Sequence, residues 1–118
     1  IKYDILSNQV FPIKEKFDII ISNPPYVTNS EKLLMQKNVT DFEPPTALYV
    51  NDDNPFIFYK RILDLSPNIA NTHYFVYFEI NEMFGKAIAE LMKTHSFNNI
   101  TVHKDFSNKD RFVVGHKL

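Results

Sequence analysis

Cysteine is absent from this chain of 118 residues, and glycine occurs only twice. The lack of cysteine excludes disulfide bonds and thiolate chemistry. A site for a nucleotide-like cofactor normally needs a glycine-rich turn, where the backbone approaches the ligand closely. Neither Gly85 nor Gly115 lies in such a turn. The sequence therefore contains no recognisable cofactor loop.

Several other features are missing as well. Basic residues are not in excess, since 13 Lys and Arg face 14 Asp and Glu for a formal net charge of −1, and this does not favour nucleic-acid binding. A signal peptide and a membrane-length apolar run are both lacking, so we expect a cytoplasmic protein with no membrane partner. We predict no metal site, because ligand spacing is not seen among the four histidines, His73, His95, His103 and His116.

What is present is enough apolar and aromatic sequence for one packed core. Hydrophobic residues make up 44% of the chain and aromatic residues 14%, including 11 Phe and 6 Tyr. This size and composition predict a single small domain whose core is rich in aromatic side chains.

The functional prediction depends on residues 17–26. Residues 17–21 form a short apolar run rich in β-branched side chains, which predicts a fully buried strand. Pro24 and Pro25 then end this strand, because neither can donate a backbone hydrogen bond. We expect a stiff loop at the carboxyl end of a strand, where open α/β sheets bind ligands.

This loop has the chemistry to bind a flat group that carries an NH2. The side-chain oxygen of Asn23 and the carbonyl of Pro24 can each accept one N–H, while Tyr26 packs against the planar face. Asn23 and Pro24 are therefore the predicted catalytic residues, and with Pro25 and Tyr26 they are the predicted substrate-binding residues. The alternative is a proline-bracketed turn without a function. The position directly behind a strand favours the functional interpretation.

The rest of the chain alternates between strand and helix patterns. β-Branched and aromatic runs predict strands, and apolar residues at helical spacing predict helices. Besides the strand over residues 17–21, the predicted strands are residues 1–6, 73–80, 98–105 and 111–117. The predicted helices are residues 31–37, 55–65 and 81–95.

The segments between these elements support an α/β layout. We expect a surface loop over residues 41–49, a capping turn over residues 51–54 and a helix end at residues 66–68. Residues 106–110 are short enough to join two antiparallel strands. The strand over residues 73–80 is expected to lie in the middle of a sheet that is covered on both faces.

The layout and motifs together resemble the release-factor glutamine methyltransferases, the HemK/PrmC family. Asn-Pro-Pro-Tyr alone also occurs in DNA adenine methyltransferases and in some RNA methyltransferases. Phe42-Glu43-Pro44 with Ala47-Leu48, and the terminal strand that starts at Asp110-Arg111, favour the glutamine enzymes. Further familial segments are residues 17–27, 58–62, 78–80, 104–106 and 110–115.

For the fold, the resemblance implies part of a Rossmann-like methyltransferase that uses S-adenosylmethionine. The expected sheet is mostly parallel and closes in an antiparallel C-terminal hairpin. Residues 1–118 would be the C-terminal portion of one methyltransferase domain, without the N-terminal substrate domain and the glycine-rich cofactor loop. In the topology of this family, the strands that begin at residues 17, 73, 111 and 98 would lie side by side in the sheet, in that order. The isolated chain is then expected to be inactive and to self-associate through an open sheet edge.

For the function, the resemblance implies methyl transfer from S-adenosylmethionine to the side-chain amide nitrogen of a glutamine in a peptide chain release factor. The release factor is then the expected partner, and no direct nucleic-acid contact is expected. Asn23 would also contact the cofactor, and Asp4 or Ile5 would lie beside its adenine. Two alternatives stay open: a DNA adenine-N6 or RNA amino-methyltransferase, and an inactive fragment or binding module.

Three more polar residues need an assignment. Glu79 ends a predicted central strand and is either a structural acceptor or a pocket residue, and the structural role is favoured. Asp110 and Arg111 are predicted to pair with each other and fix the last hairpin, which we favour over a catalytic role.

Overall fold

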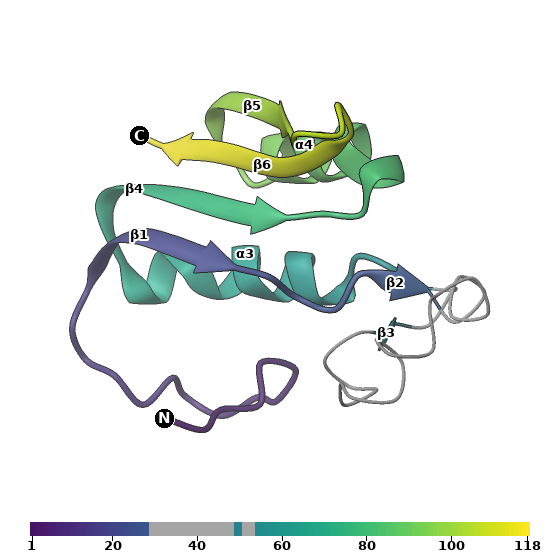
Figure 1. The fold of residues 1–118 in the computed structure, drawn as a ribbon. Helices are drawn as coiled ribbons and strands as arrows, with labels where there is room; N and C mark the ends of the chain where they lie inside the picture. Colours follow the sequence, from purple (N-terminus) through teal and green to yellow (C-terminus); the bar gives the residue numbers. More distant parts are fainter. Residues whose placement is uncertain (29–48, 51–53) are drawn as a thin grey trace.

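The main sheet has four strands in the order β1-β4-β6-β5, within the part of the chain that the computed structural model describes, residues 1–28, 49–50 and 54–118 (Figure 1). This order confirms the predicted arrangement of the four strands. A second, two-stranded sheet pairs β2 with β3 in parallel. The strand bounds are β1 Phe17–Ser22, β2 Val27–Thr28, β3 Tyr49–Val50, β4 Ala70–Glu79, β5 Asn98–Lys104 and β6 Asp110–Lys117.

The strand directions agree with the predicted mostly parallel sheet, because β1, β4 and β5 run in the same direction and only β6 of these four strands runs the opposite way. β1 runs parallel to β4, whereas β6 is antiparallel to both of its neighbours, β4 and β5. The antiparallel strand belongs to the C-terminal hairpin, since β6 turns directly back from β5 and then inserts between β5 and β4. The predicted hairpin itself is confirmed.

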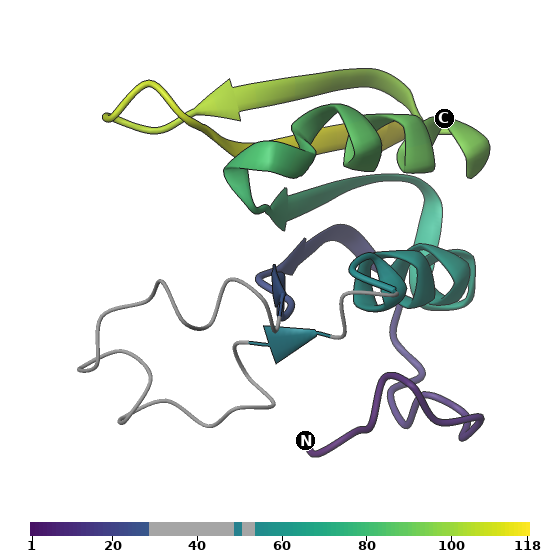
Figure 2. The same cartoon turned by 90° about the vertical axis from the view of Figure 1, so that its right-hand side faces the viewer.

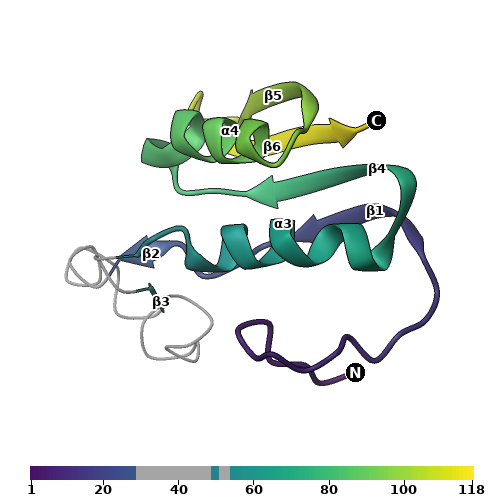
Figure 3. The ribbon, with the colours of Figure 1, turned by 180° about the vertical axis from the view of Figure 1, so that it is seen from behind.

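Two α-helices cover one face of this sheet, α3 Ile57–Ile69 and α4 Gly85–Thr94 (Figure 3). A short 3₁₀ turn, Glu82–Phe84, leads into α4. Its cap is Asn81, as predicted, whose side-chain oxygen accepts the N–H of Met83 at 3.0 Å. The predicted cap of α3 at Asn54 is wrong, because the helix begins after Phe56 without a side-chain capping bond.

Helix α3 continues through Pro67, although the sequence predicts that it ends there. A proline inside a helix lacks the N–H that would bond to the carbonyl four residues earlier, which here belongs to Leu63. The hydroxyl of Ser66 donates to that carbonyl at 2.9 Å. Ser66 also shares a hydrogen bond of 2.9 Å with the Tyr74 hydroxyl of β4. The orphaned acceptor is therefore satisfied, and the helix gains one more turn.

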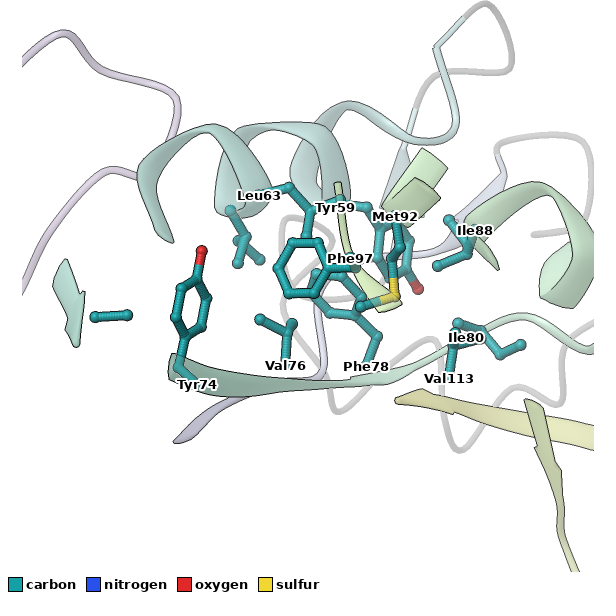
Figure 4. Close-up of a cluster of buried hydrophobic side chains, with 12 residues drawn as sticks. Tyr59, Leu63, Tyr74, Val76, Phe78, Ile80, Ile88, Met92, Phe97 and Val113 are labelled. Carbon is teal, nitrogen blue, oxygen red and sulfur yellow. The ribbon is translucent and has the colours of Figure 1, made fainter. Parts of the chain in front are cut away.

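The core lies between the helices and the helix-facing side of β4 and β6 (Figure 4). Alternate residues of β4 are buried, which is the expected pattern when one face of a strand packs on helices. The ring of Phe78 meets that of Tyr59 edge to face, with 5.0 Å between ring centroids. The fully buried large side chains are Tyr59, Phe78, Leu63, Ile80, Ile88, Met92, Val76 and Val113.

No helix of the described residues covers the opposite face of the sheet, which Figure 1 views directly. Figure 2 shows the sheet and helices from the side. On β1, Ile19 is 52% exposed and Ile21 is 78% exposed. On β4, Phe75 and Tyr77 are 38% and 37% exposed. The predictions of a fully buried β1 and of a β4 covered on both faces are therefore wrong for the described residues, because both helices pack on the same side.

The N-terminal segment does not form the predicted strand over residues 1–6. Asp4 instead folds the backbone into a local turn, in which its carboxylate accepts the N–H of Leu6 at 3.0 Å. The guanidinium of Arg61 donates to the carbonyls of Ile5 and Ser7, each at 2.8 Å. These two bonds fix the segment beside α3.

Some sequence predictions fall on residues outside the described ranges. They are the helix over residues 31–37, nearly all of the loop over residues 41–49, most of the capping turn over residues 51–54, and the motif of Phe42-Glu43-Pro44 with Ala47-Leu48. Among the described residues, we find no helix with the length and apolar character needed to cross a membrane.

The two faces of β4 give a matched test of the core. We expect Phe78→Ala to destabilise the fold by about 3–5 kcal/mol, because it empties a fully buried aromatic site. Phe75→Ala, on the uncovered face of the same strand, is expected to cost about 1 kcal/mol. The measurement is the free energy of unfolding in urea. Equal losses for the two variants would contradict the assigned burial.

Candidate active site

The Asn23-Pro24-Pro25-Tyr26 loop leaves the carboxyl end of β1. The last residue of β1, Ser22, lies in register with Phe78 of the parallel strand β4. β4 ends one residue later, at Glu79. The loop therefore starts at the sheet edge where the two parallel strands terminate, which is the edge where α/β sheets bind ligands.

The side chain of Asn23 is exposed and makes no hydrogen bond to any residue in the described ranges. Pro24, the next residue, is buried. Because Pro24 and Pro25 have no N–H, the loop offers acceptors and few donors. An exposed amide oxygen next to a backbone carbonyl can accept both hydrogens of an NH2 group.

Two cavities meet at this loop. The larger, about 420 Å³, lies among the N-terminal segment, β1 and α3, and its walls are mostly apolar. Its lining residues are Ile5, Phe11, Ile20, Ile21, Ser22, Asn23, Pro24, Pro25, Phe58, Ile62, Leu65 and Ile69. The smaller, about 150 Å³, lies on the other side of the loop. Its lining residues are Ile21, Ser22, Asn23, Tyr77, Phe78, Glu79 and Phe112. Three consecutive residues line both cavities: Ile21, Ser22 and Asn23.

Tyr26 closes the loop against the end of β4. Its hydroxyl donates a hydrogen bond of 2.7 Å to Oε1 of Glu79. Burial raises the pKa of Tyr26 to about 12, and the bond to the Glu79 carboxylate and its negative charge add to this shift. The positive charge of Arg111 opposes the shift without cancelling it. Tyr26 is therefore a protonated donor at every physiological pH.

Glu79 is held at its backbone as well as at its side chain. The buried hydroxyl of Tyr59, from α3, donates to the Glu79 carbonyl at 2.7 Å. Burial raises the pKa of Tyr59, and electrostatic interaction with Tyr26, once that side chain ionises at high pH, and with the Glu79 carboxylate raises it further. Two tyrosines from separate elements thus converge on the last residue of β4.

The hairpin beside Glu79 is fixed by two ion pairs, and neither is the predicted one. Arg111 pairs with Asp105 across the hairpin, with 3.2 Å between Nε and Oδ2. Asp110 pairs with Lys104 at 2.9 Å. The predicted pairing of Asp110 with Arg111 is wrong, because neighbours in a strand point to opposite faces. The predicted role of both residues in fixing the hairpin agrees with these pairs.

The structure places the sequence-predicted site residues as follows. Asn23, Pro24 and Pro25 line the larger cavity together with Ile5. Asp4 is not among the residues that line it, and its carboxylate is engaged in the local turn. Tyr26 lies at the far end of the loop, bonded to Glu79.

The contact of Glu79 with the loop was missed by the sequence analysis. The available signal was its position, because Glu79 is the single acidic residue of β4 and lies at the end of that strand, which pairs with the strand before the loop. A carboxylate at such a place needs a hydrogen-bonding partner. The partner could not be read from the sequence, since Tyr26 is 53 residues away.

Residues 3–112 match the family described as Eco57I restriction-modification methylase. The chain belongs to this methylase family. Its similarity to named proteins is more specific and concerns the enzymes that the sequence motifs resemble.

The chain is 41% identical over 105 residues to the release factor glutamine methyltransferase of Flavobacterium psychrophilum, covering 89% of this chain and 37% of that protein. It is 40% identical over 101 residues to the protein of the same name from Bacteroides thetaiotaomicron, covering 86% and 36%. The Enterococcus faecalis enzyme of that name is 35% identical over 101 residues, covering 85% and 36%. The resemblance to these methyltransferases is confirmed, and the chain spans little more than a third of their length.

Proposed function

We propose that the protein carrying this chain transfers a methyl group from S-adenosylmethionine to the side-chain amide nitrogen of a glutamine in a peptide chain release factor. The observation that carries the proposal is the exposed Asn23 amide beside the Pro24 carbonyl, at the carboxyl edge of the sheet and between two cavities. The names of the most similar proteins support the same acceptor. In this proposal the chain is the C-terminal portion of a Rossmann-like methyltransferase domain.

The acceptor nitrogen of an amide is a poor nucleophile, because its lone pair is delocalised into the carbonyl. Asn23 and Pro24 would each accept one N–H and so aim the lone pair at the methyl group. Positioning of this kind supplies on the order of 7–11 kcal/mol. The same acceptors stabilise the positive charge that develops on the nitrogen as the N–C bond forms. The amide loses one proton once it is methylated, and no strong base is required.

The volume of the larger cavity supports the binding of a small-molecule cofactor at this loop. Its volume of about 420 Å³ is within the roughly 300–1,000 Å³ of small-molecule sites. S-adenosylmethionine supplies a methyl group on a positively charged sulfur, and its adenine is flat and apolar on both faces. Ile5 and Asn23, which both line the cavity, would hold it. Asp4 stays a weaker candidate, since its carboxylate is used locally.

A DNA adenine or RNA amino-methyltransferase is the second candidate. The family description favours it, because a restriction-modification methylase acts on DNA. The exocyclic NH2 of adenine would also suit the same pair of acceptors. The formal net charge of −1 argues against it, because proteins that bind the phosphate backbone usually present a basic surface.

The acceptor can be decided with the full-length protein and S-adenosylmethionine that carries a labelled methyl group. We expect label on the release factor, and on glutamine after digestion and mass spectrometry. DNA and RNA serve as competing acceptors in the same assay. Label on nucleic acid with none on the release factor would overturn the proposal.

A further inference from the structure

The loop of the active site is fixed to β4 at both of its ends. At its start, Ser22 lies in register with Phe78. At its end, the Tyr26 hydroxyl is bonded to Glu79 at 2.7 Å. The two anchor points on β4 are consecutive residues. Only Asn23, Pro24 and Pro25 lie between the two anchored residues of the loop.

The two anchors differ in kind. The first belongs to a strand pairing that is shared along all of β1. The second is one hydrogen bond from one side chain to one carboxylate. If this bond were lost, Tyr26 could leave the end of β4, and the direction of the Pro24 carbonyl and the Asn23 amide could change. Among the described residues, the carboxylate of Glu79 is the group that accepts the Tyr26 hydrogen bond, and Arg111 is a second polar group that interacts with Tyr26.

The surroundings of Glu79 keep its carboxylate in place. The Tyr59 hydroxyl fixes its backbone carbonyl at 2.7 Å. The neighbouring Arg111 donates to the carbonyl of Ile80 at 3.3 Å and to the carboxylate of Asp105 at 3.2 Å. The cation next to Glu79 is thus already shared with Asp105. Glu79 also lines the smaller cavity together with Asn23, so it lies within the space that the acceptor group must enter.

We propose that Glu79 is a positioning residue, whose carboxylate holds Tyr26 and thereby sets the Asn23 amide oxygen and the Pro24 carbonyl at the spacing that an NH2 group requires. The reaction in this inference is the one given under the proposed function, on which the inference rests. The choice of Glu79 rests on the contacts described above. It assigns to Glu79 a role in turnover, not merely in strand termination.

The test compares three variants of the full-length protein. We expect Glu79→Ala to lower kcat about 100-fold, since a misplacement of about 1 Å can cost that much. Tyr26→Phe, which removes one hydroxyl, is expected to lower kcat to a similar extent. Glu79→Gln keeps an oxygen that can accept from Tyr26, and its kcat is expected to stay within about threefold of the wild type. In each variant the Kd for S-adenosylmethionine, measured by calorimetry, should change less than threefold.

A double variant and a control separate positioning from folding. Tyr26→Phe combined with Glu79→Ala should lose no more kcat than either single variant, because both remove the same bond. Asp64→Ala is the control, since it removes another hydrogen-bonded carboxylate, which pairs with Lys60 and His95 away from the loop. Its kcat should be unchanged. Thermal unfolding is measured for every variant.

Three results would overturn the inference. They are a Glu79→Ala enzyme within threefold of wild-type kcat, losses that add up in the double variant, and a Glu79→Gln enzyme as slow as Glu79→Ala. If Glu79→Ala fails to fold, Tyr26→Phe decides alone, because it removes only a hydroxyl. The assay is run on whichever acceptor the wild type methylates. A release factor that is not methylated would therefore contradict the proposed function but would not contradict the Glu79 prediction.

Discussion

Replacing Asn23 with alanine in the full-length enzyme is expected to lower kcat by about 100- to 1,000-fold, the loss seen when one preorganised hydrogen-bonding group is removed from an active site. The side chain is exposed and has no hydrogen bond to a residue in the described ranges, so its removal breaks no hydrogen bond among those residues. The fold should therefore keep its stability. Binding of S-adenosylmethionine should change much less than kcat, because Asn23 is one of many residues that line the cofactor cavity but one of only two proposed acceptors for the target amide.

Asn71→Ala is the matched control for this experiment. Asn71 is also an exposed asparagine at a strand, and its amide donates to the carboxylate of Asp18 at 2.6 Å, at the opposite end of the β1 and β4 pair. Its loss should leave kcat within about twofold. The comparison needs initial rates with labelled cofactor and calorimetry for cofactor affinity. Near-normal turnover in Asn23→Ala would show that the loop has only a structural role.

The strand order could be predicted because local and family signals agree. β4 is a long apolar run, and the short link at residues 106–110 permits only a hairpin between β5 and β6. The cap at Asn81 was predictable for the same reason, since it depends on residues two positions apart. The hairpin and the cap use information that lies close together in the sequence, whereas the order of the four strands was taken from the family resemblance.

Which face of each strand is covered could not be predicted. Ile19 and Ile20 are the same residue type, yet Ile20 packs toward α3 and Ile19 is half exposed. An unbroken apolar run fits burial on both faces, and only the placement of α3 and α4 decides the matter. The extension of α3 past Pro67 also involves a separate element, because the Ser66 hydroxyl that bonds to the Leu63 carbonyl is itself hydrogen-bonded to the Tyr74 hydroxyl of β4.

The same distinction between neighbouring and distant residues applies to the candidate site. Asn23, Pro24 and Pro25 are contiguous, so their chemistry could be proposed from the sequence. The bond that completes the loop joins Tyr26 to Glu79 across 53 residues and could not. The ion pair between Arg111 and Asp105 could not be predicted either, because it follows from the register of the hairpin.

The 118-residue chain by itself is expected to self-associate, with β1 as the contact. β1 is an edge strand of the main sheet and pairs only with β4 within the described residues. An edge with free backbone groups and apolar side chains invites pairing with another chain. The uncovered face adjoins this edge, where Ile21 is 78% exposed and Ile19 is 52% exposed. Light scattering on the isolated chain should therefore give a mass of at least two copies.

Two lysine substitutions distinguish association through β1 from non-specific hydrophobic association. Ile19→Lys places a charge on the exposed side of the edge strand, and we expect it to shift the chain to a monomer. Val10→Lys is the control, since Val10 is 90% exposed in the N-terminal segment, outside the sheet. It should leave the mass unchanged. A stable wild-type monomer that binds S-adenosylmethionine at micromolar strength would contradict the prediction, because it would show that the chain needs no further surface to cover its edge or to hold the cofactor.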